Sequence, residues 1–278
     1  MGMGFLVLVL GWMVQASWAF SLTDHETITR QAAAELNGCY PGVLTTADVE
    51  LLVSENLDED TNLFRKWTEF SHYYHPQKKL NMFRKDSMDR IESLEADLSD
   101  PMVEDSPYAI AGHMIHHLQD SAVPAHAVPV DHIWDDGFES LELAQEDFVD
   151  PAYRTRCRQI RDGVDPHLRG FEGLLKRSAL ETLLSLRSPV VLTIGGRKTT
   201  QTWTAFWQES SNSDFGQYGV MGNSFGLSDF LTPGAVPVQV KSDPVQYRLF
   251  KKKQIRLAVE STKKVLYLVR LLKWQNWY

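Results

Sequence analysis

Four histidines and one aspartate are crowded into residues 112–127, GHMIHHLQDSAVPAHA. A helix advances about 100° per residue, so three of these histidines and Asp120 fall within an arc of about 100°, opposite an apolar side that faces the core. Imidazole nitrogen and carboxylate oxygen together suit Zn²⁺, and His116 and Asp120, four residues apart, can reach one metal or let the carboxylate bridge two. Pro124 ends the helix and returns His126 toward the same place. The segment therefore predicts a metal site; the alternative is a polar helix face whose imidazoles contact water and neighbouring carboxylates.

Other histidines and carboxylates can be joined to this helix in chain order. Asp60 lies twelve residues before His72, which begins the aromatic segment His-Tyr-Tyr-His-Pro, and His25 precedes both. Each residue taken alone would be a solvated surface side chain. Together with the central helix they form an ordered set of candidate ligands.

This set resembles the zinc-dependent phospholipase C family, which includes bacterial phosphatidylcholine-hydrolysing enzymes and clostridial alpha-toxins, and its relatives the fungal single-strand-specific zinc nucleases. The resemblance covers Phe20 to about Phe148, and its most specific part is the pattern His-x-x-x-Asp-x-x-x-Pro-x-His that starts at His116. It implies two to three zinc ions per chain. The ligands it implies are Phe20 through its terminal amino group, His25, Asp60, His72, His116, Asp120 and His126.

The last pair of ligands departs from the family pattern. The family has a histidine four residues before its final acid, but here Glu139 is preceded at that distance by Asp135, and the nearest histidine is His132. Three versions stay open: His132 binds across a small insertion, Asp135 replaces the imidazole, or His132 pairs with Asp136 as in the nucleases. We expect Glu139 and His132 to complete the third zinc site with His126.

The resemblance implies a phosphodiester hydrolase in which Asp120 bridges two zinc ions and Asp60 is the general base that orients the attacking water. The first hypothesis is a phospholipase C-like enzyme that cleaves a phospholipid to diacylglycerol and a phosphorylated head group, with transient contact to a membrane surface. The alternatives are a secreted zinc nuclease or nucleotidase acting on single-stranded nucleic acid, and a non-catalytic zinc-binding protein. A net charge of −8 argues against a stable nucleic-acid partner, and we expect a monomer.

Residues 1–19, MGMGFLVLVLGWMVQASWA, contain no charged side chain and predict a signal peptide for a secreted or periplasmic protein. Cleavage after Ala19 would expose Phe20; cleavage after Ala16, or a leader retained as a membrane anchor, are the alternatives. Residues 20–278 are expected to form one helical domain. In an exported protein Cys39 and Cys157 are candidates for one disulfide, although a free buried pair is also compatible with the sequence.

The hydrophobic periodicity predicts an all-α fold with one β-hairpin insertion. The hairpin is expected at residues 190–203, around Gly195 and Gly196, and residues 210–243 are expected to be a long loop or lid, within an insertion of about 188–243. The predicted helices span residues 23–35 (from a capping box at Thr23), 46–55, 85–98, 107–123, 137–148, 153–186 with a break near 163–166, and 247–274. The last of these is expected to pack on the core rather than on a membrane surface. The histidines left over, for which we expect structural roles, are His75, His113, His117 and His167.

Overall fold

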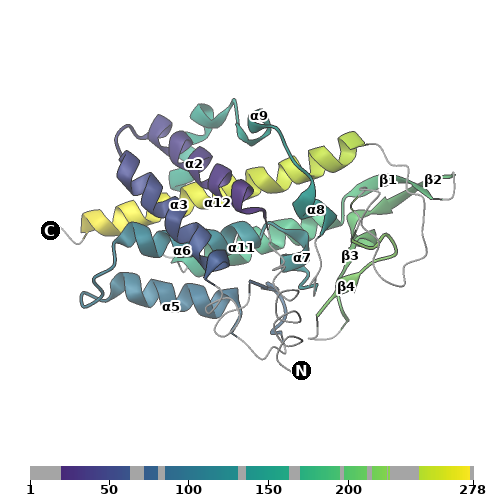
Figure 1. The fold of residues 1–278 in the computed structure, drawn as a ribbon, viewed down its shortest axis with the longest axis horizontal. Coiled ribbons are helices and arrows are strands. Elements are labelled where there is room, and N and C mark those ends of the chain that lie inside the picture. The colour runs from purple at the N-terminus through teal and green to yellow at the C-terminus, as the bar shows by residue number, and fades with distance from the viewer. Residues whose placement is uncertain are drawn as a thin grey trace, which may run out of the picture.

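The computed structural model describes residues 20–62, 72–80, 85–130, 136–162, 170–194, 197–211, 215–223, 225 and 244–275. Helices dominate this part of the chain, and the strands form two small antiparallel pairs (Figure 1). The predicted all-α class with a hairpin insertion is therefore confirmed. The leader (1–19), His132, Asp135 and His167 lie outside the described residues.

The main helices are α2 (Leu22–Cys39), α3 (Thr46–Thr61), α5 (Ser87–Ser99), α6 (Pro107–Asp120), α11 (Gly170–Leu186) and α12 (Pro244–Gln275). Shorter helices are α7 (Pro124–Ala127), α8 (Gly137–Ser140), α9 (Gln145–Phe148), η1 (Tyr153–Arg156), α10 (Cys157–Asp162) and η2 (Trp203–Ala205). The strands are β1 (Pro189–Ile194), β2 (Arg197–Thr202), β3 (Trp207–Gln208) and β4 (Gln217–Tyr218).

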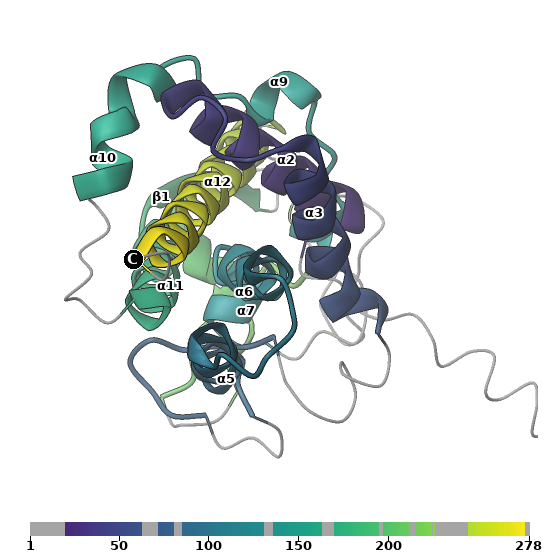
Figure 2. The same ribbon diagram turned by 90° about the vertical axis from the view of Figure 1, so that its left-hand side faces the viewer.

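Helix α6 lies at the centre of the bundle. It packs against α3, α5, α11 and α12, which surround it in the end-on view of Figure 2. Ala111, Met114, Ile115 and Leu118 on this helix are all buried. The polar residues of α6 are therefore brought inside the molecule with the apolar ones, as expected for a helix covered on nearly every side.

The ends of these helices follow from local side-chain chemistry. Ser21 caps α2 by accepting a hydrogen bond from Asp24 N at 3.0 Å, so the capping box predicted at Thr23 is wrong and the helix begins earlier. Helix α6 ends at Asp120, before the predicted residue 123, because Pro124 has no N–H to donate to the Asp120 carbonyl. The chain turns there, and a second short helix carries His126.

Other predicted helices differ in length. Helix α3 continues to Thr61, beyond the expected end at residue 55, which places Asp60 on a helix. The predicted helix 137–148 is two single turns, α8 and α9, separated by residues 141–144. Likewise, η1 and α10 precede α11 where one broken helix was expected. Residues 163–169, the expected break, lie outside the described part.

The predicted hairpin is confirmed. Strands β1 and β2 pair from Pro189 opposite Thr202 to Ile194 opposite Arg197. A second pair, β3 with β4, was not predicted; it falls partly inside the segment expected to be a loop. Beside these strands, the buried aromatic rings of Trp203, Phe206, Trp207 and Phe225 pack with Phe250, which lies near the start of α12.

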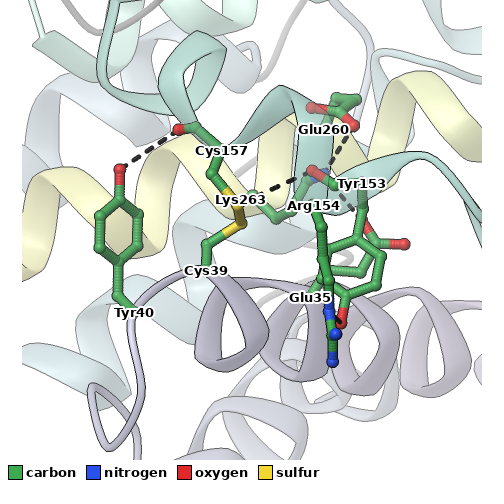
Figure 3. Close-up of a disulfide and its surroundings, with 8 residues drawn as sticks. All are labelled: Glu35, Cys39, Tyr40, Tyr153, Arg154, Cys157, Glu260 and Lys263. Carbon is green, nitrogen blue, oxygen red and sulfur yellow. Dashed lines mark hydrogen bonds and ion pairs between the residues drawn. A yellow bond between two sulfur atoms is a disulfide. The ribbon is translucent and has the colours of Figure 1, made fainter.

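Cys39 and Cys157 form a disulfide that joins the end of α2 to the start of α10 across 118 residues of sequence (Figure 3). The free-pair alternative is thus excluded. Nearby, Lys263 of α12 is buried and its Nζ lies 2.7 Å from Glu35 of α2 and 2.6 Å from Glu260. The disulfide and this ion pair both hold α2 against the carboxyl-terminal half of the chain.

Among the described helices, none combines the length and hydrophobicity that a bilayer-spanning segment requires.

Candidate metal centre

Asp120, the last residue of α6, lies at the centre of a group of imidazoles that come from four segments of the chain. Its Oδ1 lies 3.3 Å from His25 Nε2 of α2. Its Oδ2 lies 3.0 Å from His72 Nδ1 and 3.3 Å from His116 Nε2. His126 Nδ1, from α7, lies 3.6 Å from the same oxygen. The two carboxylate oxygens therefore face different imidazoles.

Asp60, near the end of α3, adds a second carboxylate to this group. Its oxygens lie 4.0 Å from His25 Nε2, 3.7 Å from His72 Nδ1 and 4.0 Å from His116 Nε2. We call the set His25, Asp60, His72, His116, Asp120 and His126 the Asp120 cluster. Ligand atoms of two overlapping triads in it lie within 4.8 Å of one another, so these buried groups could hold a metal ion; the triads are His25, His116, Asp120 and Asp60, His72, His116.

The polar atoms at the centre of the cluster are poorly satisfied by the protein itself. His25, His116 and Asp120 are completely buried. Within the described part of the chain, both oxygens of Asp120 and the Nε2 of His25 make no hydrogen bond of ordinary geometry. Burial of such atoms is costly unless a partner is supplied. A bound cation would satisfy them, and the donor set of imidazole nitrogens and carboxylate oxygens fits one.

Two buried amide side chains orient the histidines. His25 Nδ1 donates to Gln119 Oε1 at 2.6 Å, and His116 Nδ1 donates to Asn56 Oδ1 at 3.2 Å. Each bond places a proton on Nδ1 and turns Nε2 toward Asp120. A hydrogen bond of this kind, on the far side of the ring, fixes the tautomer and direction of a metal-binding histidine.

The amides are themselves held by the hydroxyl of Thr29. This hydroxyl donates to the His25 carbonyl at 2.8 Å and accepts from Asn56 Nδ2 at 2.9 Å and Gln119 Nε2 at 3.0 Å. The orientation of both amides is fixed in this way, because a flipped amide would face the hydroxyl with its oxygen. The ring of His126 is positioned separately: its Nδ1 donates to the His72 carbonyl at 2.9 Å.

The carboxylates and imidazoles of the cluster shift one another's pKa. Burial alone would lower the pKa of His116, but Asp120 and Asp60 outweigh it and raise that pKa to about 9. Burial would raise the pKa of Asp120, but His116 and His126 outweigh it and hold it well below the ordinary value. The carboxylates thus attract cations strongly enough to keep a proton on a buried imidazole. A metal ion would compete for the same position.

A second group of titratable side chains surrounds Glu59, the residue before Asp60 on α3. Glu59 is buried and accepts from Arg90 Nη2 at 2.7 Å, while His113 Nδ1 lies 2.9 Å away and His117 Nε2 3.6 Å away. We call Glu59, Arg90, His113 and His117 the Glu59 cluster. Burial would raise the pKa of Glu59, but hydrogen bonds from His113 and His117 outweigh it and lower this pKa well below the ordinary value. Burial also lowers the pKa of His117 to about 4, and its Nδ1 lies 3.2 Å from Ser87 Oγ.

The start of the described chain lies against the Asp120 cluster. The ring of Phe20 is fully buried and packs edge-on against His25, with centroids 5.8 Å apart. Lys251 of α12 is also fully buried; its Nζ lies 3.0 Å from Asp24 and donates to the Glu139 carbonyl at 3.1 Å. This lysine ties the beginning of α2 to α8.

The predicted third site is not assembled within the described residues, because His132 and Asp135 lie outside them. Glu139 is buried in α8. Asp136, one of the alternative ligands, accepts from Trp207 Nε1 at 2.9 Å and from Tyr218 Oη at 2.8 Å, so its carboxylate serves the packing of the β3–β4 pair. The third zinc stays a prediction.

His75 was expected to have a structural role. Its Nε2 lies 3.2 Å from Glu209 Oε2, and burial lowers the pKa of this imidazole.

Several functional side chains were not predicted. Asn56 lies one helical turn before Asp60, and Gln119 directly precedes Asp120. An amide one turn from a candidate ligand is a weak signal that could have marked Asn56. Glu59 gives no such signal, because an acid beside another acid on a helix is most often solvated.

A scan against protein-family models, a search of curated proteins and a search of solved structures each found no match to this chain.

Proposed function

We propose that this protein is a zinc-dependent phosphodiester hydrolase of the phospholipase C type. The observation that carries the proposal is the position of Asp120, whose two buried oxygens face different imidazoles. Oδ1 lies against His25, and Oδ2 lies against His72 and His116. A carboxylate in this position suits a bridge between two metal ions, which a purely structural site does not need.

In this proposal one zinc would be held by Asp60, His72, His116 and Asp120, and a second by His25, Asp120 and the amino group of Phe20. A third would be held by His126 with Glu139 and His132. When bound, the ions supply an activated water and neutralise charge on the phosphoryl oxygens.

The chain's own groups have distinct tasks in this scheme. Asp60 is the general base: its carboxylate lies 3.7 to 4.0 Å from three of the imidazoles and would accept the proton of the attacking water. Gln119 and Asn56 hold the rings of His25 and His116, so the ligands are in place before substrate binds. Burial of the cluster keeps bulk water from weakening these charge interactions.

A nuclease is the second candidate, and one contact favours it. The centroid of the half-buried Tyr73 ring lies 5.1 Å from that of the His126 ring and 5.2 Å from that of the Phe215 ring. Aromatic rings beside a phosphodiesterase centre can stack on bases of single-stranded nucleic acid. The net charge of −8 favours the phospholipid instead.

The test uses purified mature protein loaded with zinc. Hydrolysis of phosphatidylcholine vesicles to diacylglycerol and a phosphorylated head group, abolished by a chelator and restored by zinc, is the expected result. Cleavage of single-stranded DNA in place of the lipid would select the nuclease. Zinc binding without either activity would leave the non-catalytic zinc protein, and fewer than one zinc per chain would refute the metal proposal.

The proposal also requires a processed amino terminus in a secreted or periplasmic protein. A free amino group at Phe20 can bind zinc once it is deprotonated, and the Phe20 ring already packs on His25. We expect mass spectrometry of the exported protein to find Phe20 first. An added methionine should reduce zinc content and activity; a different terminus with full activity would contradict this.

A further inference from the structure

A separate set of metal-type ligands lies on the outer side of the contact between α3 and α6. His113 Nε2 lies 3.2 Å from Glu55 Oε2. Ligand atoms of Glu55, Asp58 and His113 all lie within 4.8 Å of one another. We call these three residues the outer triad. None of them belongs to the Asp120 cluster.

The backbone brings the triad together. Glu55 and Asp58 are three residues apart on α3 and therefore share one helix face. Helix α6 approaches this face closely at Gly112, where an added Cβ would lie 2.7 Å from the Glu55 Cβ and 2.9 Å from the Leu52 carbonyl oxygen. His113 directly follows that glycine, so its imidazole reaches across to the carboxylates of α3.

The imidazole of His113 is fixed in direction by a residue outside the triad. Its Nδ1 lies 2.9 Å from Glu59 Oε1, and Glu59 is held by Arg90 and stays buried. A carboxylate on the far nitrogen is the arrangement that orients metal-binding histidines. The other nitrogen, Nε2, points to Glu55. The side chains of His113 and Glu55 are 12% and 28% exposed, so an ion can reach this position from solvent.

We propose that the outer triad is a separate zinc site, with Glu55, Asp58 and His113 Nε2 as three protein ligands and water completing the coordination. An imidazole with two carboxylates favours zinc over Ca²⁺ or Mg²⁺, which take oxygen ligands. The site tethers α3 to α6 from the outside. It does not depend on the proposed hydrolase function, because it shares no ligand with the Asp120 cluster.

The competing arrangement is an imidazolium of His113 placed between the carboxylates of Glu55 and Glu59, with no metal. Zinc titration distinguishes the two. We expect the double variant Glu55→Gln/Asp58→Asn to bind one zinc fewer per chain than wild type in calorimetry and elemental analysis. The matched control is Glu92→Gln, which removes one charge from the exposed face of α5 and should keep the wild-type count.

A second measurement isolates the outer site from the Asp120 cluster. An Asp120→Asn variant should keep the zinc of the outer triad, and adding His113→Ala to it should lower the zinc count by one more per chain. Crystals soaked in zinc should give anomalous density between Glu55, Asp58 and His113. An unchanged zinc count in the Glu55→Gln/Asp58→Asn variant, with circular dichroism confirming its fold, would overturn the proposal. Hydrolysis should persist in the Glu55→Gln/Asp58→Asn variant, because neither residue belongs to the Asp120 cluster. Failure of the outer zinc site and failure of the proposed hydrolase function are therefore measured separately.

Discussion

Neighbouring residues on two helices supply two clusters of opposite character. Asp60 and His116 belong to the Asp120 cluster, while Glu59 and His117, the adjacent residues, belong to the Glu59 cluster. In the first, neutral amides hold the histidines, and the oxygens of Asp120 make no ordinary hydrogen bond within the described chain. In the second, an arginine and two imidazoles surround one carboxylate.

The contrast separates a carboxylate that could hold a metal ion from one that supports its neighbours. A carboxylate that is already neutralised by a buried arginine gains little from a cation, and it serves to position other groups. A buried carboxylate whose nearest neighbours are the nitrogens of oriented imidazoles, with no arginine or lysine of the described chain against it, is the kind that a metal cation would stabilise. Glu59 is the first kind, and Asp120 is the second.

The largest effect expected from this comparison is that of Asp120→Asn. Removing the bridging charge should abolish nearly all hydrolysis and release zinc from the Asp120 cluster. Activity assays and elemental analysis of the purified variant check both. Full zinc content at this cluster would contradict the bridging role.

Glu59→Ala should act mainly on stability. It leaves Arg90 buried without its carboxylate, and loss of one member of a buried pair costs about 3–5 kcal/mol. Chemical denaturation of metal-free protein measures the change in the free energy of unfolding. If the change is below about 1 kcal/mol, the Glu59 cluster does not have the supporting role assigned to it.

Gln119→Ala and Asn56→Ala should each weaken zinc binding about 10- to 100-fold, because the histidine behind each amide loses its orientation. Competition with a chelator measures the affinity. A fitting control is Gln31→Ala, since the Gln31 amide bonds only to Glu35 on the same helix in the described contacts. Equal affinity in all three variants would remove the distinction between the two clusters.

Gly112→Ala should have the smallest effect of these substitutions, and it should disturb both the Asp120 cluster and the Glu59 cluster. The added methyl group meets Glu55 Cβ and the Leu52 carbonyl, so α3 and α6 must separate slightly. Overpacking of this kind costs about 1–3 kcal/mol. Thermal unfolding should show the loss, together with weaker zinc binding; an unchanged melting temperature would indicate that the helices adjust freely.

Much of the fold could be predicted from local patterns. The helix containing Asp120, its end before Pro124 and the hairpin at 190–203 all follow from periodicity, proline and glycine, which act over a few residues. The second strand pair could not be predicted in this way. Strands β3 and β4 are two residues each, and Asp136, distant in sequence, helps to hold them through Trp207 and Tyr218.

For the candidate site, the sequence alone determined the types of ligand, their order and the helix face that carries His113, His116, His117 and Asp120. It could not determine which of these side chains meet. On α6 they share one arc, but α3 packs closely on α6 and presents two adjacent acids to it. His116 and Asp120 therefore lie with Asp60, while His113 and His117 lie with Glu59. Helix periodicity fixes a direction for each side chain, whereas the partner found in that direction depends on how helices distant in sequence pack.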